Sequence, residues 1–211
     1  MNTPTWAQLV NLAVAVLFIL SLKGLSSPKT ARLGTGLGAL GALIATVVLF
    51  FTGIELNNFA LIIGAILAGS LVGWFSARRV RMTAMPQLVA LFNGVGGGAA
   101  GLVAVVEYLH LGGEGSALFS LFTVVTIIIG SVAFSGSIVT YLKLQEIMTT
   151  RPVVLPAGKW ITILVALGTI ASAVWLFVDP QMWVVLLLSV LALAFGVLFV
   201  LPVGGADVPI V

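Results

Sequence analysis

The sequence predicts an all-α protein, a polytopic transmembrane helical bundle of about seven helices with its N-terminus outside the membrane. Apolar residues make up 61% of the chain and charged residues only 7%, a composition that excludes a soluble globular domain. A helix needs about 20 apolar residues to cross the hydrocarbon layer. The apolar runs that meet this need are residues 6–22, 33–54, 58–76, 85–107, 117–141, 160–177 and 181–201.

Basic residues fall in every second connection between these runs. Positive charge favours cytoplasmic loops, so this pattern places the N-terminus outside. The net charge of +3 then follows from topology, and we expect a lipid bilayer rather than nucleic acid as the surroundings of the chain. The nine basic residues are Lys23, Lys29, Arg32, Arg78, Arg79, Arg81, Lys143, Arg151 and Lys159.

The first three runs show interface anchors and small residues. Trp6 opens the first run and Trp74 ends the third, where an indole ring can lie among lipid headgroups. Small residues four apart let two helix backbones approach closely in lipid. This spacing occurs for Gly34 with Gly38 in the second run and Gly69 with Gly73 in the third.

The fourth run, 85–107, is the least like generic membrane sequence. It begins at Pro86, a residue suited to the first turn of a helix, and is then rich in glycine. Its literal G-x-G-x-x-G, residues 96–101, follows no strand and lies within an apolar run, so we expect no dinucleotide there. The glycines that we expect to pack against a neighbouring helix are Gly94, Gly97, Gly98 and Gly101.

Polar side chains occur inside the fourth and fifth runs. Asn93 lies about two turns into its helix and needs a partner, either an interhelical hydrogen bond or water in a path. Hydroxyls on the fifth run either bond to their own helix or line such a path, and none titrates near neutrality. One sector of that helix holds Thr123, Thr126, Gly130, Ser137 and Tyr141.

The outer end of the fourth run carries Glu107, Tyr108 and His110, either the mouth of a path or an ordinary solvated interface. The chain contains no cysteine, no H-E-x-x-H motif and no nucleophile with a nearby base in sequence. We therefore expect no metal site and no self-contained catalytic site in this chain.

The last two runs are bounded by Trp160, Trp175 and Trp183, and a tail follows them. The tail, residues 203–211, has a loop, then a proline suited to a first helical turn. We divide the chain into a transmembrane helical domain, 1–202, and the start of a further helix, 203–211. We expect a polypeptide that continues, or one whose C-terminal part has been removed.

Three segments resemble a known family. They are R-V-R-M-T-A-M-P-Q-L-V-A at 79–90, F-S-G-S at 134–137 followed by Lys143 and Leu144, and G-G-A-D-V-P at 204–209. In this order they are similar to the membrane part of the beta subunit of proton-translocating NAD(P) transhydrogenase. That resemblance implies that the last two membrane helices and a soluble NADP(H) domain are missing here.

The resemblance also implies a function. The complex would move hydride between NAD(H) and NADP(H) while protons cross a bacterial inner membrane. Neither cofactor would bind to this chain, because the alpha subunit holds NAD(H) and the missing domain holds NADP(H). The implied partners are the membrane helices and NAD(H) domain of the alpha subunit, the NADP(H) domain, and a second copy of the complex in a homodimer.

The resemblance assigns roles to particular residues. Many family members have histidine at the position of Asn93, so here Asn93 would bind water or gate, and a partner helix would supply the titrating group. Ser137 matches a serine of the family's corresponding helix. The candidate proton path is Asn93, Ser137, Thr126, Tyr141 and Glu107. The candidate coupling loops, 77–84 and 142–159, carry Arg78, Arg79, Arg81, Lys143 and Arg151, which otherwise serve only as topology signals.

Two other functions stay open on the residues alone. A small-solute permease would also use glycine-rich helices and a polar stripe, although transporters typically show internal repeats and this chain shows no convincing inverted repeat. A purely structural membrane subunit is the third possibility.

Overall fold

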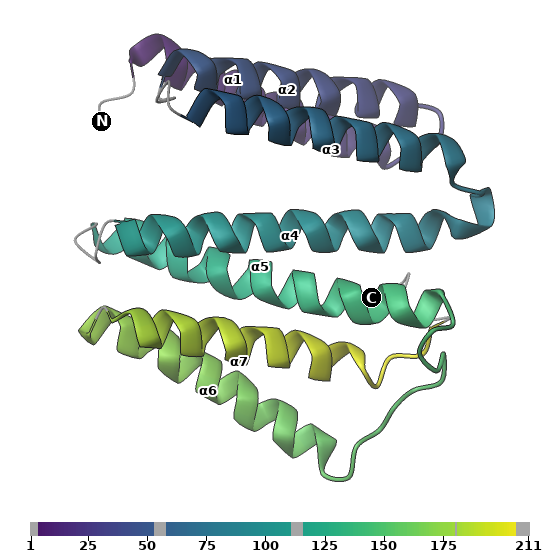
Figure 1. Cartoon of the computed structure of the whole chain (residues 1–211), viewed down its shortest axis with the longest axis vertical. Coiled ribbons are helices and arrows are strands. Elements are labelled where there is room, and N and C mark those ends of the chain that lie inside the picture. Colours follow the sequence, from purple (N-terminus) through teal and green to yellow (C-terminus); the bar gives the residue numbers. More distant parts are fainter. Residues whose placement is uncertain (1–3, 53–57, 111–115, 180, 206–211) are drawn as a thin grey trace. The chain divides into compact units, whose positions relative to one another are not determined.

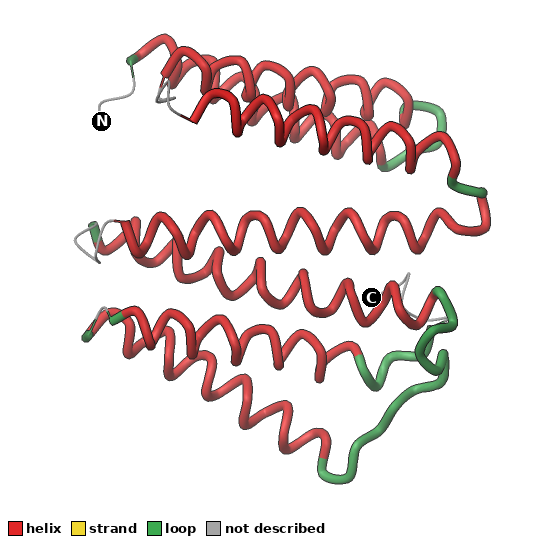
Figure 2. The backbone as a smooth tube through the Cα atoms, viewed as in Figure 1, coloured by secondary structure: helices red, strands yellow, loops and turns green. Residues whose placement is uncertain are grey.

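The computed structural model describes residues 4–52, 58–110, 116–179 and 181–205 (Figure 1). Helices are the regular elements of this described part, and seven of them are long and apolar enough to cross a membrane. Figure 2 shows the helices in red and the described turns and loops in green. The elements are α1 (Thr5–Leu25), α2 (Ala31–Thr52), α3 (Phe59–Arg79), the 3-10 turn η2 (Met82–Ala84), α4 (Met85–His110), α5 (Ala117–Leu144), α6 (Gly158–Val178) and α7 (Met182–Val200).

The predicted all-α transmembrane architecture is confirmed, with differences at the helix ends. Helix α4 continues to His110 and α5 to Leu144, beyond their apolar runs. Lys143, expected in a connecting loop, therefore lies in the last turn of α5. Backbone hydrogen bonds do not require apolar side chains, and long polar side chains at helix ends can reach the membrane interface.

The chain divides into two compact units, residues 1–75 and residues 76–211, which we describe separately. In the first unit α1 packs against α2. The Ser21 hydroxyl donates to the Gly34 carbonyl oxygen at 2.7 Å, and a Cβ at Gly34 would lie 2.8 Å from the Ser21 carbonyl oxygen. A Cβ at Gly38 would lie 2.7 Å from Ser21 Oγ. Both glycines of this pair thus face α1.

The Gly69 and Gly73 pair behaves differently. Within the first unit, a side chain at either position would meet nothing within 4 Å. The spacing that predicted a tight crossing here does not produce one inside this unit. A four-residue spacing describes the surface of one helix, and a crossing also needs a second helix opposite it.

In the second unit, α5 packs against α4 on one side and α7 on the other, and α6 packs against α7 (Figure 1). An apolar core closes one end of this unit, where four helices meet. Toward the other end α6 and α7 diverge, and residues 145–157 bridge the wider space (Figure 1). The core consists of Ala104, Tyr108, Val124, Ile127, Leu176, Val184, Val185 and Leu188.

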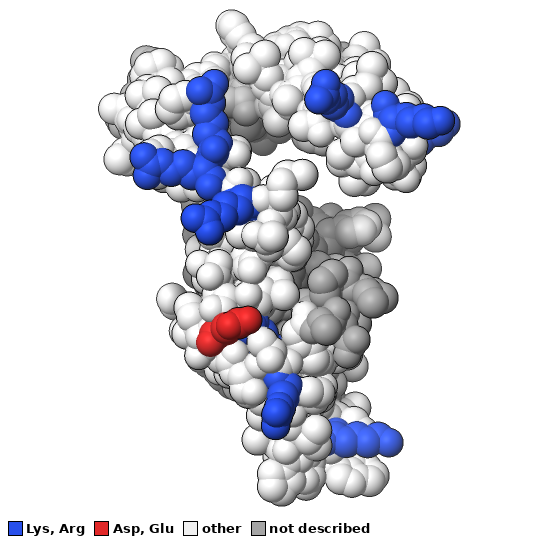
Figure 3. All heavy atoms as spheres, turned by 90° about the vertical axis from the view of Figure 1, so that its right-hand side faces the viewer, with Lys and Arg blue, Asp and Glu red and all other residues white. Residues whose placement is uncertain are grey.

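The end of the second unit opposite this core is basic. It joins the beginning of α4, the end of α5 and the beginning of α6, and blue Lys and Arg side chains gather over it in Figure 3. This segregation is what a transmembrane unit with one cytoplasmic face requires. The basic residues of this unit are Arg78, Arg79, Arg81, Lys143, Arg151 and Lys159.

Candidate functional site

A hydrogen bond between two polar side chains joins α4 to α5 inside their apolar stretches. Asn93 Nδ2 donates to Ser137 Oγ at 2.8 Å. Ser137 is 7% exposed, whereas Asn93 is exposed at the surface of the second unit. The pair therefore reaches from the covered α4–α5 interface to the open face of α4. Both residues were predicted from the sequence, and the structure brings them together.

Glycines on α4 make this contact possible. A Cβ at Gly94 would lie 2.9 Å from the Cβ of Ser137, and a Cβ at Gly97 would lie 2.8 Å from the Cβ of Ala133. A Cβ at Gly98 would lie 2.8 Å from the ring of Phe134. Such distances are shorter than carbon atoms tolerate, so larger residues would push α5 away.

Gly101 on α4 and Gly130 on α5 complete the same crossing. A Cβ at Gly130 would lie 2.5 Å from the Gly97 carbonyl oxygen and 2.7 Å from the Gly101 amide nitrogen. Here the two helices meet backbone against backbone. All four packing glycines expected on α4 thus lie against α5.

A small cavity of about 190 Å³ lies beside Ser137, between α5 and α7. Its polar lining comes from Ser137 and Thr140, and Val132, Ala133, Gly136, Phe199, Val200 and Val203 complete the wall. Because a water molecule takes about 30 Å³ of liquid volume, the cavity is large enough for a few waters. Ser137 thus lies between the Asn93 amide and a space suited to ordered water.

Lys143 lies beyond this cavity, at the basic end, and is completely buried. Its Nζ donates to the carbonyl oxygens of Leu201 at 2.5 Å, Val203 at 2.6 Å and Val200 at 3.4 Å. A cation is favourable at a helix C-terminus, where carbonyl groups lack intrahelical partners. Lys143 therefore fastens the end of α5 to the end of α7.

Backbone hydrogen bonds extend this connection into a junction between residues 143–153 and 200–205. The Val153 amide donates to the Leu201 carbonyl oxygen at 3.1 Å, and the Gly205 amide donates to that of Thr150 at 2.8 Å. Residues 203–205, expected to lead into a further helix, form part of this turn, and 206–211 lie outside the described residues. We call this the Lys143 junction.

Gln87 ties the beginning of α4 to the same end of the unit. Its Nε2 donates to the Leu144 carbonyl oxygen at 3.0 Å, at the end of α5. Gln87 was not among the residues predicted from the sequence. Its place one residue after Pro86, in the first turn of a helix, was the available signal, since polar side chains there often bond to free backbone groups.

Thr126 and Glu107 lie in a different place from Asn93 and Ser137. They line a groove of about 650 Å³ between α4 and α5, toward the end of the unit opposite the basic residues. Thr126 Oγ1 donates to the Phe122 carbonyl oxygen of its own helix at 2.7 Å. Thr126 and Ser137 are about 16 Å apart along α5 at 1.5 Å per residue. The glycine crossing lies between these two groups of polar residues.

The two tyrosines named from the sequence, Tyr141 and Tyr108, differ in how far they are buried. Tyr141 is half-buried one turn beyond Ser137. Tyr108 was grouped with the exposed residues Glu107 and His110, but it is buried, and its hydroxyl donates to the Leu176 carbonyl oxygen of α6 at 3.1 Å. Its seven-residue spacing from Gly101 on one helix face was a signal for burial.

The candidate coupling residues differ in how exposed their side chains are. Arg78, Arg79, Arg81 and Arg151 have exposed side chains at the basic end. Lys143 is buried in the junction instead, so its side chain is not presented to a soluble domain.

The segment 96–101 does not fit a dinucleotide. It lies in the interior of α4, where backbone amides donate within the helix, and three of its four glycines face α5. In the part of the chain that the structure describes, no three His, Cys, Asp or Glu residues are grouped as metal ligands. The polar site that remains is Asn93, Ser137 and the adjoining cavity.

Comparison with known proteins places this chain in a family. The family model described as the NAD(P) transhydrogenase beta subunit matches residues 7–211. The chain is similar to the NAD(P) transhydrogenase subunit beta of Rhodospirillum rubrum, with 33% identity over 207 residues, 95% of this chain and 44% of the relative. A second protein of that name, from a named strain of the organism, matches equally. The chain thus spans less than half the length of these relatives.

Proposed function

The chain belongs to the NAD(P) transhydrogenase beta subunit family, and from this premise we propose that it forms the proton-translocating membrane part of such an enzyme. In the proposed complex, hydride passes between NAD(H) and NADP(H) on other domains while protons cross the membrane. Seven helices of spanning length support a multi-pass membrane subunit. We propose further that its N-terminus lies outside and that the membrane is a bacterial inner membrane.

The observation that carries this proposal is the Asn93–Ser137 hydrogen bond beside a cavity large enough for a few water molecules. An amide can donate and accept hydrogen bonds at once, and a hydroxyl can do the same. Together these groups can order water, but neither changes its charge by gaining or losing a proton near neutrality. Their task would be to align or interrupt a water chain. The group that titrates would come from a partner helix facing the open side of Asn93.

Because this chain would order water and other parts of the complex would supply the titrating group and the nucleotide sites, the proposed partners are as follows. The alpha subunit would bring membrane helices and the NAD(H) domain, and a further domain of the beta subunit would bind NADP(H). The exposed arginines Arg78, Arg79, Arg81 and Arg151 would face the nucleotide domains at the basic end. The whole complex would form a homodimer.

The test is proton coupling in the intact complex. The complex that contains this chain is reconstituted into liposomes, and NADPH-dependent reduction of an NAD analogue is followed with and without an uncoupler. We expect hydride transfer to accelerate severalfold when the uncoupler removes the proton gradient, because the gradient opposes continued turnover.

Two results would contradict the proposal. Hydride transfer at one rate with or without the uncoupler would show an enzyme without proton coupling. An intact complex without any hydride transfer would return the small-solute permease to consideration.

A further inference from the structure

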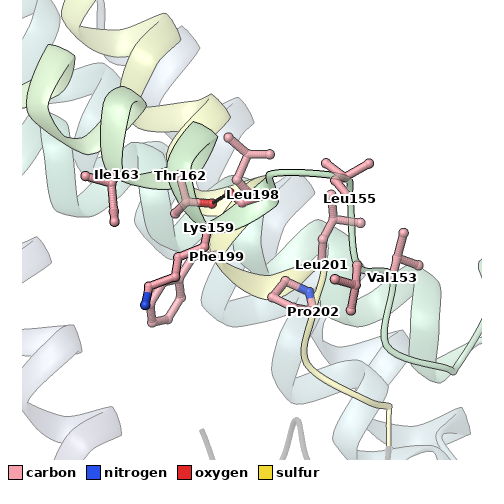
Figure 4. A pocket seen from close by; sticks show the side chains of 11 residues that line it. Val153, Leu155, Lys159, Thr162, Ile163, Leu198, Phe199, Leu201 and Pro202 are labelled. Atoms are coloured by element: carbon pink, nitrogen blue, oxygen red, sulfur yellow. Dashed lines mark hydrogen bonds between the residues drawn. The ribbon is translucent and has the colours of Figure 1, made fainter.

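An apolar cavity at the basic end of the second unit lies between α6 and α7 (Figure 4). It encloses about 420 Å³, within the roughly 300–1,000 Å³ range of small-molecule sites. Leu155 from the connecting segment, Ile163 from α6 and Phe199 from α7 contribute to its apolar wall. We call this space the α6–α7 groove.

The backbone creates this groove. Helices α6 and α7 pack tightly at the core end, where Leu176 and Leu188 are buried, and they diverge toward the basic end. Residues 153–157 close the gap only partly, since Val153 is held to Leu201 by a backbone hydrogen bond. Ala157 then takes a left-handed conformation, with φ of 58°, before α6 begins. The space that remains is open at the side.

The side chains at the open side are apolar and exposed. Ile163 is 41% exposed and Phe199 51% exposed, and the apolar face of α6 continues past the groove with Leu164 and Leu167, 72% and 62% exposed. Apolar side chains of a transmembrane helix that are not covered by protein meet acyl chains. The groove is therefore a recess in the part of the unit that lipid chains reach.

One charged side chain stands at the groove. Lys159, in the first turn of α6, is one of its lining residues, and in Figure 4 its side chain runs in the same direction as that of Phe199, away from Leu155 and Leu201. The next residue, Trp160, is 71% exposed, as expected of an indole at the level of the headgroups. The lining contains no acidic residue, and Glu146, the described acidic residue at this end, is not part of it.

From this arrangement we propose that the α6–α7 groove binds an anionic phospholipid of the surrounding bilayer. One acyl chain lies between α6 and α7, and the phosphate pairs with Lys159. Basic recesses between transmembrane helices on the cytoplasmic side suit anionic headgroups, and a single lysine near the surface favours them by about fivefold, the ratio for about 1 kcal/mol. The site is independent of the Asn93–Ser137 pair and of the proposed enzymatic function.

The test uses the full complex in nanodiscs with phosphatidylcholine and a photoreactive phosphatidylglycerol that carries the reactive group on its acyl chain. Cross-linked peptides are identified by mass spectrometry. We expect labelling of residues 153–163 and 198–202. Lys159→Gln should lower labelling there about fivefold, and Ile163→Trp, which fills the groove, should abolish it.

Matched controls separate the site from general membrane effects. Lys29→Gln removes an exposed lysine of the first unit, and Leu167→Trp adds an indole to α6 outside the groove. Both should leave labelling unchanged. Equal labelling by a photoreactive phosphatidylcholine would overturn the role of Lys159. Absence of label from the groove of the wild-type complex would overturn the proposal, and would show that another protein segment fills the space.

Discussion

Asn93 and Lys143 are both polar residues of apolar helices, but their surroundings give them different roles. Lys143 is fully buried, and three backbone carbonyl oxygens accept its hydrogen bonds. Asn93 has one side-chain hydrogen bond, to Ser137, and stays exposed on α4. A buried cation with carbonyl partners stabilises a junction, whereas an exposed amide at membrane depth has capacity for water or a partner helix.

Replacing Asn93 by leucine tests its role. Interhelical hydrogen bonds in membranes contribute on average about 0.6 kcal/mol, so Asn93→Leu should assemble almost normally. If Asn93 orders a water chain, proton pumping by the reconstituted complex should nevertheless fall at least tenfold.

The control for this variant is Thr46→Val, because the Thr46 hydroxyl donates to Ala42 of its own helix at 2.8 Å. It removes a polar group from α2 without touching the pair. Normal pumping by a fully assembled Asn93→Leu complex would exclude a path-lining role.

Replacing Lys143 by methionine tests the junction. The variant keeps an unbranched stem but leaves carbonyl groups without their cation, which costs about 1–3 kcal/mol for buried polar groups. We expect a lower thermal midpoint and faster hydrogen exchange at the Val153 and Gly205 amides. Lys29→Met, at an exposed position, should change neither quantity. Unchanged exchange in Lys143→Met would show that the backbone hydrogen bonds hold the junction alone.

At the scale of elements, the α4–α5 crossing sets the distance between the polar residues. Gly130 touches the backbone of Gly97 and Gly101, so the helices approach as closely as their main chains permit. This close contact brings Ser137 within hydrogen-bond distance of Asn93. It also separates Thr126 and Glu107 from that pair, because it leaves no space for polar side chains between them.

Two glycine-to-alanine variants test this crossing. A Cβ at Gly130 would lie 2.5 Å from the Gly97 carbonyl oxygen, whereas a Cβ at Gly96 would meet nothing within 4 Å in the described residues. Overpacking costs about 1–3 kcal/mol. Gly130→Ala should therefore lower the thermal midpoint and reduce coupling, and Gly96→Ala should leave both unchanged. Equal stability of the two variants would show that α4 and α5 are not in such close contact.

For the whole protein, the positions of the basic residues predict which end of the helices faces the cytoplasm. The basic residues of the second unit lie at one end, and the positive-inside rule assigns that end to the cytoplasm. The predicted outside N-terminus depends on this rule together with seven crossings.

The absence of cysteine from the chain allows a direct test. Single cysteines are introduced at the exposed residues His110 and Thr149, and intact cells are treated with a membrane-impermeant maleimide. We expect His110→Cys to react at once and Thr149→Cys to react only after permeabilisation. The reverse pattern would invert the topology, and with it the proposed position of the nucleotide domains.

The part of the fold that the bilayer determines, the positions of the spanning helices, was predictable from the sequence. Helix length and hydropathy located every spanning helix within a few residues, because a lipid environment leaves the backbone no other partner. The candidate site was only partly predictable. Asn93 and Ser137 were both predicted and form a hydrogen bond, whereas the predicted Thr126 lies apart from them and its hydroxyl bonds to its own helix.

The sequence by itself determined that this protein is a multi-helix membrane protein of the transhydrogenase beta subunit family, because composition and local motifs are properties of the chain alone. Only the tertiary structure decided which small residues meet another helix, separating Gly34 from Gly69. It alone also decided that Lys143 and Tyr108 are buried against backbone carbonyls of α7 and α6. The physical reason is that such contacts need a second helix opposite, and the spacing of residues along one helix does not specify that neighbour.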